Sequence, residues 1–326
     1  MQAPKFWYDI EIAKKLWYWP FLTGLSKIYL WCHQQYQNAS SSYHVDIPVF
    51  CVGNIVAGGA GKTPTALMLH SLLNKKYKNI AFLSRGYGGD LEGPVFVDLN
   101  IHRPKDVGDE PLLLAKHART IIAKDKAAGA RYAIENNIDC IILDDGFQNP
   151  HLQKSCHVLV IDGRGFGNEE LIPAGPLREP IKEALEKADI VIATEPLPQQ
   201  VKAHLKANWL PVFKGNFTAQ IKTPEDPKVF GFAGIANPEK FKKTLEDNGY
   251  DIVGFMGFPD HHVYTEHDMQ RLYDKARTVQ LITTEKDAVK IPSHWQNKIQ
   301  TLPITLTIEN QKDLDKWLET HLSSNA

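Results

Sequence analysis

Residues 53–64 read Gly-Asn-Ile-Val-Ala-Gly-Gly-Ala-Gly-Lys-Thr-Pro and follow directly on an apolar run, Ile47–Val52. Glycines in this place let successive backbone N–H groups close around phosphate oxygens at the N-terminus of the next helix. Lys62 would reach the β- and γ-phosphates of a nucleotide, and the Thr63 hydroxyl would hold Mg²⁺. The stretch therefore predicts a phosphate-binding loop between a strand and a helix.

One position departs from the common phosphate-loop pattern GxxxxGK[ST], because its first glycine would fall at Val56. The closely spaced glycines resemble instead the GGxGKT variant of that loop. A glycine-rich turn that happens to precede a lysine is the alternative interpretation. The expected nucleotide contacts are Asn54, Gly58, Gly59, Ala60, Gly61, Lys62, Thr63 and Pro64.

The pattern around this loop predicts an α/β fold with a parallel sheet wound with helices. Runs of continuous rather than alternating hydrophobicity mark strands that are covered on both faces. The expected strands are Ile47–Val52, Ile80–Leu83, Cys140–Leu143, Val158–Ile161 and Ile190–Ala193, and the helical stretches between them include Pro64–Lys76 and Pro111–Ala118.

A second series of strands and helices predicts a smaller α/β domain. Its strands are Val229–Phe232, Ile252–Phe255 and Leu281–Thr283, and its helices are Pro238–Asn248 and Thr265–Arg277. The proline-punctuated stretch Pro196–Pro227 is the expected boundary. We therefore expect an N-terminal segment (1–35), a phosphate-loop domain (36–210) and a C-terminal domain (211–326), whose last helix, Lys312–Leu322, could pack on either half.

Composition excludes several classes of protein. The chain has 326 residues, 43% of them apolar, so it can bury a core, and its net charge of −1 gives no field that would attract nucleic acid. Its four cysteines, Cys32, Cys51, Cys140 and Cys156, have no metal-site or disulfide spacing, which favours a reducing compartment. We expect neither a signal peptide nor a membrane-spanning helix.

The N-terminal segment is unusually aromatic. Nine aromatic residues, four of them Trp, occur in the first 31 positions, where about three are expected. Lysines lie among them, as in a helix that rests in the headgroup region of a membrane. A helix buried against the next domain explains the same residues, and the segment alone does not decide between the two.

Acidic residues follow the strand Cys140–Leu143. A phosphate-loop enzyme needs a carboxylate at the end of a neighbouring strand to fix its metal, and Asp144 or Asp145 would supply it. Asp109 precedes a helix, and its position there is typical of an N-terminal cap. The alternative is that Asp109 is the group that orients or deprotonates the acceptor hydroxyl of a kinase. The cluster Asp260, His261, His262 and His267 fits a polar loop, a metal site or a histidine partner for a carboxylate.

Two loops carry a single arginine each. Residues 84–89 contain Arg85 and Tyr87, and residues 173–180 contain Arg178 and Glu179. Both loops suit recognition of a phosphate or a sugar by a fixed guanidinium, and ordinary surface loops are the alternative.

The order of these segments resembles the tetraacyldisaccharide 4'-kinase family of lipid A biosynthesis. The resemblance rests on residues 53–64, 84–88, 108–111, 143–148, 173–180, 230–235, 260–261 and 283–290, and it spans nearly the whole chain. It implies transfer of the γ-phosphoryl group of ATP to the 4'-hydroxyl of a tetraacylated glucosamine disaccharide 1-phosphate, which forms lipid IVA at the cytoplasmic face of the bacterial inner membrane.

The resemblance also implies roles for individual residues. Lys62 and Thr63 would bind the triphosphate and Mg²⁺, Asp144 and Asp145 would bind the metal, and Asp109 would be the catalytic base with His261 as its partner. Tyr87, Arg178 and Glu179 would contact the substrate. Asn149, Lys154 and Ser155 replace the His and the Arg-Asp pair that are usual in the family, so no role is transferred to them.

A lipid with four acyl chains stays in its membrane, so the resemblance favours peripheral attachment through residues 1–31. It implies neither a nucleic-acid partner nor a protein partner. Two other classes remain as alternatives from the residues alone. A switch ATPase would use the GGxGKT loop to hydrolyse ATP without a lipid acceptor, and a metalloenzyme would be centred on the Asp260–His267 cluster.

Overall fold

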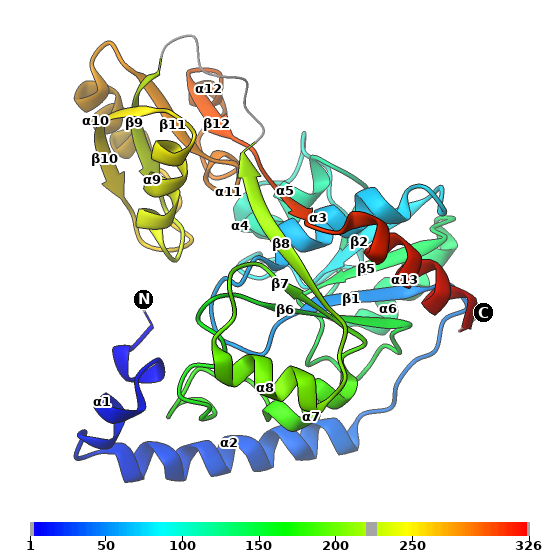
Figure 1. Ribbon diagram of the computed structural model, residues 1–326. Coiled ribbons are helices and arrows are strands. Elements are labelled where there is room, and N and C mark those ends of the chain that lie inside the picture. The colour runs from blue at the N-terminus through cyan, green and yellow to red at the C-terminus, as the bar shows by residue number, and fades with distance from the viewer. Residues whose placement is uncertain (1–2, 220–226, 325–326) are drawn as a thin grey trace.

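The computed structural model describes residues 3–219 and 227–324, which form two β-sheets with helices packed against them (Figure 1). The large sheet has nine strands in the order β13-β8-β7-β6-β1-β5-β2-β4-β3. Neighbours from β8 through β4 are parallel, and β13 and β3 run antiparallel at the two edges. Its strands are β1 (Val49–Gly53), β2 (Ile80–Ser84), β3 (Val95–Phe96), β4 (Thr120–Ile122), β5 (Cys140–Asp144), β6 (Cys156–Ile161), β7 (Ile190–Ala193), β8 (Val212–Ala219) and β13 (Ile304–Ile308). The predicted α/β fold with a parallel-rich sheet is confirmed.

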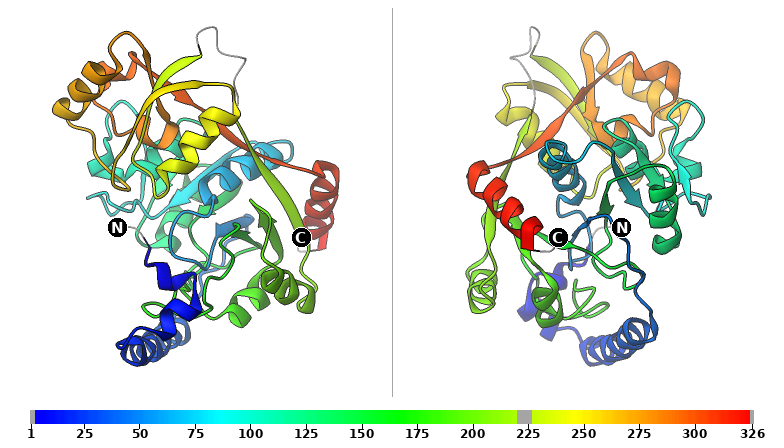
Figure 2. Two further views of the ribbon diagram at one scale, coloured as in Figure 1. Left: turned by 60° about the vertical axis from the view of Figure 1, so that its left-hand side comes forward. Right: turned by 90° about the vertical axis from the view of Figure 1, so that its right-hand side faces the viewer.

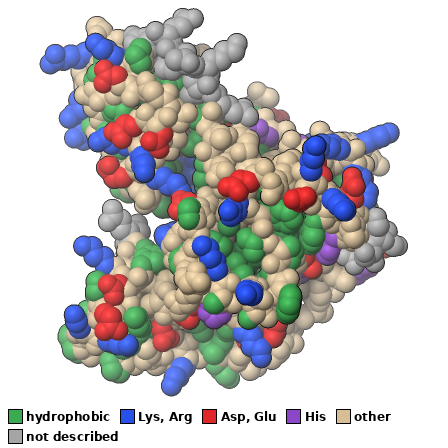
Figure 3. Space-filling model, in the orientation of Figure 1, with side chains coloured by type: hydrophobic (Ala, Val, Ile, Leu, Met, Phe, Trp, Pro, Cys, Tyr) green, Lys and Arg blue, Asp and Glu red, His purple; other side chains and the backbone are tan. Residues whose placement is uncertain are grey.

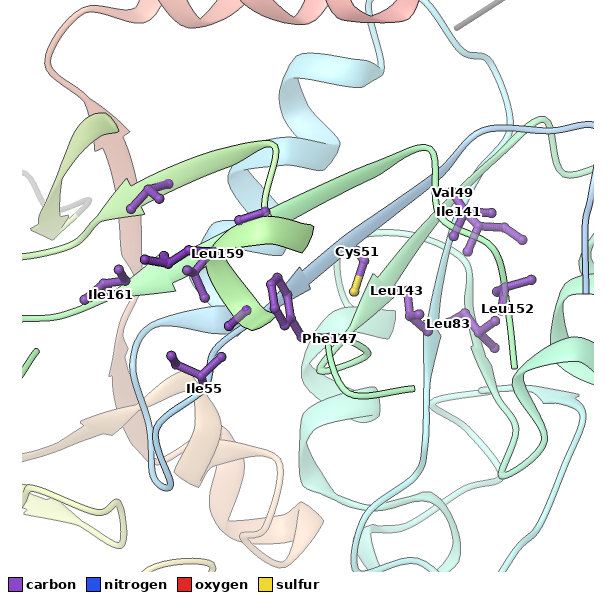
Figure 4. Close-up of a cluster of buried hydrophobic side chains, with 14 of the residues drawn as sticks. Val49, Cys51, Ile55, Leu83, Ile141, Leu143, Phe147, Leu152, Leu159 and Ile161 are labelled. Atoms are coloured by element: carbon purple, nitrogen blue, oxygen red, sulfur yellow. The ribbon is translucent and has the colours of Figure 1, made fainter. Parts of the chain in front are cut away.

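Helices on both faces of the large sheet bury its apolar strands. They are α3 (Lys62–Leu73), α4 (Pro104–Val107), α5 (Asp109–Ala115), α6 (Lys126–Glu135), α7 (Ile181–Lys187), α8 (Gln199–Ala207) and α13 (Gln311–Ser324). Figure 4 shows one of the two resulting cores, in which Cys51 and Leu143 from adjacent strands lie close to Phe147. Because β1, β5 and β6 are buried on both faces, they read as continuous apolar runs in the sequence.

A second, four-stranded sheet is formed by residues 228–302, which we call the small-sheet unit. Its strands are all parallel in the order β10-β9-β11-β12. The strands are β9 (Lys228–Ala233), β10 (Asp251–Gly257), β11 (Gln280–Thr284) and β12 (Ile299–Leu302), and the helices are α9 (Pro238–Asp247), α10 (Glu266–Ala276), α11 (Glu285–Ala288) and α12 (Ser293–Gln296).

The two sheets do not divide at the predicted boundary of residue 211. The stretch expected to be a linker contains α8 and β8, and β8 pairs with β7 in the large sheet. After the small-sheet unit the chain returns as β13, which pairs with β8, and α13 then packs on the large-sheet core. The chain therefore leaves the large sheet at β8 and returns to it at β13, and both strands can be followed in Figure 2. β8 escaped prediction because its residues alternate between exposed and partly buried positions.

The N-terminal segment forms a short 3-10 turn (Lys5–Trp7) and two helices, α1 (Ile10–Lys14) and α2 (Trp19–Ala39). In Figure 1, α2 runs along the lower edge of the molecule. One side of α2 is anchored by the Ser26 hydroxyl, which donates a hydrogen bond to the carbonyl of Leu171 (2.7 Å). No helix in the described part of the chain is both long and apolar enough to cross a membrane.

Candidate active site

The phosphate loop lies between β1 and α3, and three side chains, one of them within the loop, hold three of its successive carbonyl groups. Gly58 accepts from Asn54 Nδ2 (3.3 Å), Gly59 from Arg164 Nη2 (2.6 Å) and Ala60 from Thr194 Oγ1 (3.4 Å). In a trans peptide the next N–H points the opposite way from the carbonyl. The N–H groups of Gly59, Ala60 and Gly61 are therefore turned away from these partners, an arrangement that suits an anion.

Gly61 ends the loop in the left-handed region (φ 91°) and caps α3. A Cβ atom there would lie 2.8 Å from the ring of Phe217. Lys62 begins the helix, and its Nζ donates to Asn54 Oδ1 (3.2 Å) and lies 3.5 Å from Asp145 Oδ2. The lysine is thus held over the loop whose carbonyls Asn54 also binds, and Thr63 and Pro64 follow on the same cleft wall.

Asp144 and Asp145 follow one another at the end of β5 but have opposite environments. Asp145 lies beside Lys62, and Arg178 Nη1 donates to both of its oxygens (3.1 and 3.2 Å). Burial raises the pKa of Asp145, but Lys62 and Arg178 outweigh it and hold that pKa below its ordinary value. Burial raises the pKa of Asp144, and neighbouring Glu110 and Asp145 raise it further.

Both carboxylate oxygens of Asp144 are buried and have no hydrogen-bond partner among the described residues. Buried carboxylates are normally paired or coordinate a metal. The donor set of Asp144, Asp145 and the hydroxyl of Thr63 is oxygen only, as Mg²⁺ prefers. The residues at the start of α3 and the end of β5 therefore fit a divalent cation.

Glu179 follows Arg178 but does not reach the cleft. It is fully buried, its carboxylate accepts from Gln148 Nε2 (2.8 Å), and it pairs with Lys187. The same Gln148 nitrogen donates to the Asn54 carbonyl (2.9 Å). Glu179, predicted as a substrate contact, is placed where it supports the phosphate loop.

Asp109 and His261 meet across the two sheet units, 152 residues apart in sequence. The Nδ1–H of His261 donates to Asp109 Oδ2 (3.0 Å) and Oδ1 (3.2 Å). Burial raises the pKa of Asp109, but the His261 hydrogen bond and Lys286 outweigh it and leave that pKa below its ordinary value. The bond to Asp109 raises the pKa of His261 despite its burial. The pair therefore favours a carboxylate beside a protonated imidazole.

Three further contacts surround this pair. Gly108 adopts a φ of 87°, and a Cβ there would lie 2.4 Å from the Tyr87 carbonyl, so the close approach requires glycine. Tyr87 is largely exposed and lies edge-on to His261, with ring centroids 6.0 Å apart. Lys286 from the small-sheet unit pairs with Glu110 (3.1 Å), beside Asp109.

One cleft of about 1930 Å³ is lined by both groups of residues. Gly58–Thr63, Asp144, Asp145 and Arg178 lie on the large-sheet side, while His261 and Lys286 come from the small-sheet unit. Figure 3 shows the surface hollowed between that unit and the rest of the molecule. Asp109 does not line the cleft, because only 7% of its side chain is exposed, against 38% for His261.

The predicted alternative of a metal centre at residues 260–267 is wrong for the described structure. His261 pairs with Asp109, and His262 pairs instead with Asp268 (3.1 Å). These side chains form no metal-binding group within residues 3–219 and 227–324.

Sequence reasoning missed several residues that the fold brings to the cleft: Arg164, Gln148, Lys286, Glu110 and Lys126. Lys126 is buried, and its Nζ donates to the Ala123 carbonyl (2.8 Å). Burial and nearby Arg85 lower its pKa to about 7, against an opposing effect of Asp144. Gln148 and Lys286 lie inside segments that carried the family resemblance, a signal that could have found them.

The three positions that depart from the family have local partners. Lys154 donates to the carbonyl of Asn149, and Ser155 Oγ accepts from the Val49 N–H (3.1 Å). Ser155 thereby helps to hold the start of β1.

Comparison with known proteins agrees with this geometry. Residues 15–323 match the family model described as Tetraacyldisaccharide-1-P 4'-kinase (LpxK). The chain is 40% identical over 329 residues to the tetraacyldisaccharide 4'-kinase of Rhodospirillum centenum, covering 99% of this chain and 97% of that one. It is 41% identical over 296 residues to the enzyme of that name from Gluconobacter oxydans, covering 87% and 88%.

A solved structure is similar over nearly the whole fold. It is LpxK from Aquifex aeolicus in complex with ATP, which matches with a TM-score of 0.76 and 27% identity over 95% of this chain and 99% of that one. The family resemblance is confirmed by both sequence and structure. The chain therefore belongs to the tetraacyldisaccharide 4'-kinase family and is an ATP-binding kinase of lipid A biosynthesis.

Proposed function

We propose that this kinase transfers the γ-phosphoryl group of ATP to the 4'-hydroxyl of a tetraacylated glucosamine disaccharide 1-phosphate, with lipid IVA as product. The observation that carries the proposal is the Asp109–His261 pair, which joins the two sheet units at the cleft that also contains Lys62. A phosphate-binding loop alone is common to many ATPases. A carboxylate–histidine pair whose imidazole lines the same cleft would supply a place for an acceptor hydroxyl.

The donor side binds the triphosphate. The inward N–H groups of residues 59–61 and the Lys62 ammonium would bind its oxygens, and Asn54 holds the loop in that shape. Thr63, Asp144 and Asp145 would hold Mg²⁺, which neutralises charge on the transferring phosphate when bound. Most of the catalysis then comes from position and charge.

On the acceptor side, the 4'-oxygen bonds to the γ-phosphorus while the bond from that phosphorus to the β–γ bridging oxygen breaks and ADP leaves. The hydroxyl proton goes to the Asp109–His261 pair. An alcohol has a far higher pKa than either group, so the pair orients the hydroxyl first and takes its proton late. Tyr87 and Arg178 would contact the disaccharide, and Glu179 supports Asn54 through Gln148.

The acceptor's four acyl chains remain in the membrane, since each buried CH₂ contributes about 0.8 kcal/mol to its attachment. The N-terminal segment offers a surface for the enzyme to reach it. Trp17, Phe21, Ile28 and Trp31 are 90%, 67%, 59% and 62% exposed. In α2, the last three project within one face. Exposed Lys14, Lys15 and Lys27 lie among them. We infer peripheral attachment to the cytoplasmic face of the inner membrane through residues 1–31.

Transfer of labelled γ-phosphate to tetraacyl disaccharide 1-phosphate in mixed micelles tests the proposal. A labelled lipid should form, and Lys62→Ala should suppress it. Lys75→Ala is the matched control, because Lys75 is largely exposed and pairs only at the surface with Asp315 (3.2 Å). Release of phosphate from ATP at the same rate without lipid, and no lipid product, would contradict the proposal and indicate a switch ATPase.

A further inference from the structure

The loop that follows β6, residues 162–178, lies between the N-terminal segment and the phosphate loop; we call it the connecting loop. Five backbone positions in it bind the N-terminal segment, and one of them is the Ala174 N–H, which donates to Ser26 Oγ (3.1 Å). The Asn168 N–H donates to the Trp7 carbonyl (2.7 Å), Trp7 Nε1 donates to the Pro173 carbonyl (3.0 Å), Ser26 Oγ donates to the Leu171 carbonyl (2.7 Å), and Tyr29 Oη donates to the Arg178 carbonyl (2.7 Å).

The opposite side of the connecting loop binds the active site. The Ala57 N–H donates to the Pro176 carbonyl (2.8 Å), and the Arg178 N–H donates to the Ile55 carbonyl (2.8 Å). The Arg178 guanidinium contacts Asp145, as described above. One loop of 17 residues, 162 to 178, therefore touches the phosphate loop, Asp145 and the segment that carries the exposed aromatic face.

Arg164 is the contact closest to the phosphate-binding glycines. Its guanidinium is fixed by Asp162, with Nη2 2.7 Å from Oδ2 and Nε 2.9 Å from the same oxygen. Nη2 also donates to the Gly59 carbonyl (2.6 Å), and Nη1 lies 3.4 Å from Tyr8 Oη in the N-terminal segment. Because the Gly59 carbonyl and the Ala60 N–H share one peptide plane, Arg164 determines where that N–H points.

We propose that the connecting loop couples attachment of the N-terminal segment to a lipid surface with nucleotide binding, and that Arg164 is a positioning residue for the phosphate loop. The inference rests on the membrane attachment proposed above. Anchoring the segment restrains the loop that shapes the phosphate site. Nucleotide binding then loses less conformational entropy, so its affinity rises. Such coupling is reciprocal: bound nucleotide strengthens attachment by the same factor.

The test measures the dissociation constant of a non-hydrolysable ATP analogue by calorimetry, with no lipid acceptor present. Vesicles of phosphatidylethanolamine and phosphatidylglycerol should tighten binding by about fivefold or more, the usual lower range of coupling between sites. The analogue should increase co-sedimentation of the protein with the same vesicles by the same factor.

Variants of α2 then trace the route. Ser26→Ala removes two hydrogen bonds to the connecting loop and Tyr29→Phe removes one, so both variants should bind vesicles normally while vesicles no longer tighten analogue binding. Thr23→Ala is the matched control on the same helix, because its hydroxyl donates within the helix to the Pro20 carbonyl (2.9 Å), and it should keep the full effect. Arg164→Lys should weaken analogue binding by about tenfold with or without vesicles, and raise KM for ATP more than it lowers kcat.

Three outcomes overturn the inference. Vesicles that bind the protein without changing its analogue affinity would exclude the coupling, and full retention of the effect in both Ser26→Ala and Tyr29→Phe would exclude the connecting loop as its route. Failure to co-sediment with vesicles would reject the membrane attachment and the coupling together. Product formation in mixed micelles is measured separately, so none of these results is confused with failure of phosphoryl transfer.

Discussion

Replacement of Asp109 by Asn separates its proposed chemistry from its structural role. Asp109 stands in the first turn of α5, where its Oδ1 accepts from the Glu110 N–H (3.0 Å). The amide oxygen of Asn can accept the same bond, so at a pH above the raised pKa of His261, where the ion pair with Asp109 is already lost, we expect the stability of the variant to change little. The amide carries no charge and cannot take a proton, so the acceptor side of the reaction loses its base.

The expected loss follows from what the carboxylate does in the structure. A positioned general base contributes about 10²–10⁴-fold in rate, or roughly 2.7–5.4 kcal/mol of barrier at 1.36 kcal/mol per tenfold. Removing the charge also removes the group that raises the pKa of His261, so the imidazole becomes neutral more readily. A neutral imidazole can accept the hydroxyl proton in place of Asp109, although from a less direct position. We therefore expect the lower part of the range, about 10²–10³-fold in kcat/KM.

The assay is transfer of labelled phosphate to the lipid acceptor in mixed micelles, with thermal unfolding measured on the same preparations. Asp106→Asn is the matched control, because Asp106 Oδ2 accepts from the Arg103 N–H (2.7 Å) in a capping role on α4, whereas the partner of His261 is Asp109. The control should keep nearly full activity. A loss of less than tenfold in Asp109→Asn, at unchanged stability, would refute Asp109 as the base and leave it as a helix residue that orients His261.

Two further predictions concern pH and metal. The folded-state pKa of Asp144 lies above its unfolded value, so ionisation of this carboxylate destabilises the fold as the pH rises toward that raised pKa. Asp144→Asn should therefore raise the melting temperature in metal-free buffer, and by more at pH 9 than at pH 6. The same variant should abolish stabilisation by Mg²⁺ with ATP. An unchanged response to Mg²⁺ in that variant would argue against Asp144 as a ligand. Because the folded-state pKa of His261 is raised, its contribution to stability is full below its unfolded pKa and is lost as pH rises through the folded pKa, so the melting-temperature difference between the unmodified protein and His261→Gln should shrink from pH 6 to pH 9. A difference that stays constant or grows over that range would contradict the ion pair.

The central strands and the phosphate loop were predictable because their signals are local. β1, β5 and β6 are buried on both faces, so hydrophobicity alone marks them, and the loop carries its glycines and Lys62 in adjacent positions. β8 gave no such signal, since its residues alternate in exposure and its partner β13 lies about 90 residues further along. The predicted boundary at residue 211 failed for that reason.

The contacts that complete the site depend on long-range packing. His261 lies in a loop whose local sequence suits a cap, a metal ligand or a carboxylate partner equally, and only the fold brings it to Asp109. The family resemblance suggested that pair before the structure did. Arg164 had no comparable signal, because an arginine after a strand is usually a surface residue. Only the fold places its Nη2 2.6 Å from the Gly59 carbonyl oxygen.

The unequal environments of Asp144 and Asp145 indicate how the site changes when nucleotide enters. Lys62 lies 3.5 Å from Asp145 and also reaches Asn54, so it stays over the phosphate loop while neutralising a carboxylate. A triphosphate competes for Lys62, and Asp145 then keeps only Arg178. Asp144 and Asp145 would together hold a divalent cation, which would restore the charge balance at Asp145 and give Asp144 the partner it lacks. The pair of carboxylates therefore favours nucleotide and metal entering together, since either alone would leave a buried charge uncompensated.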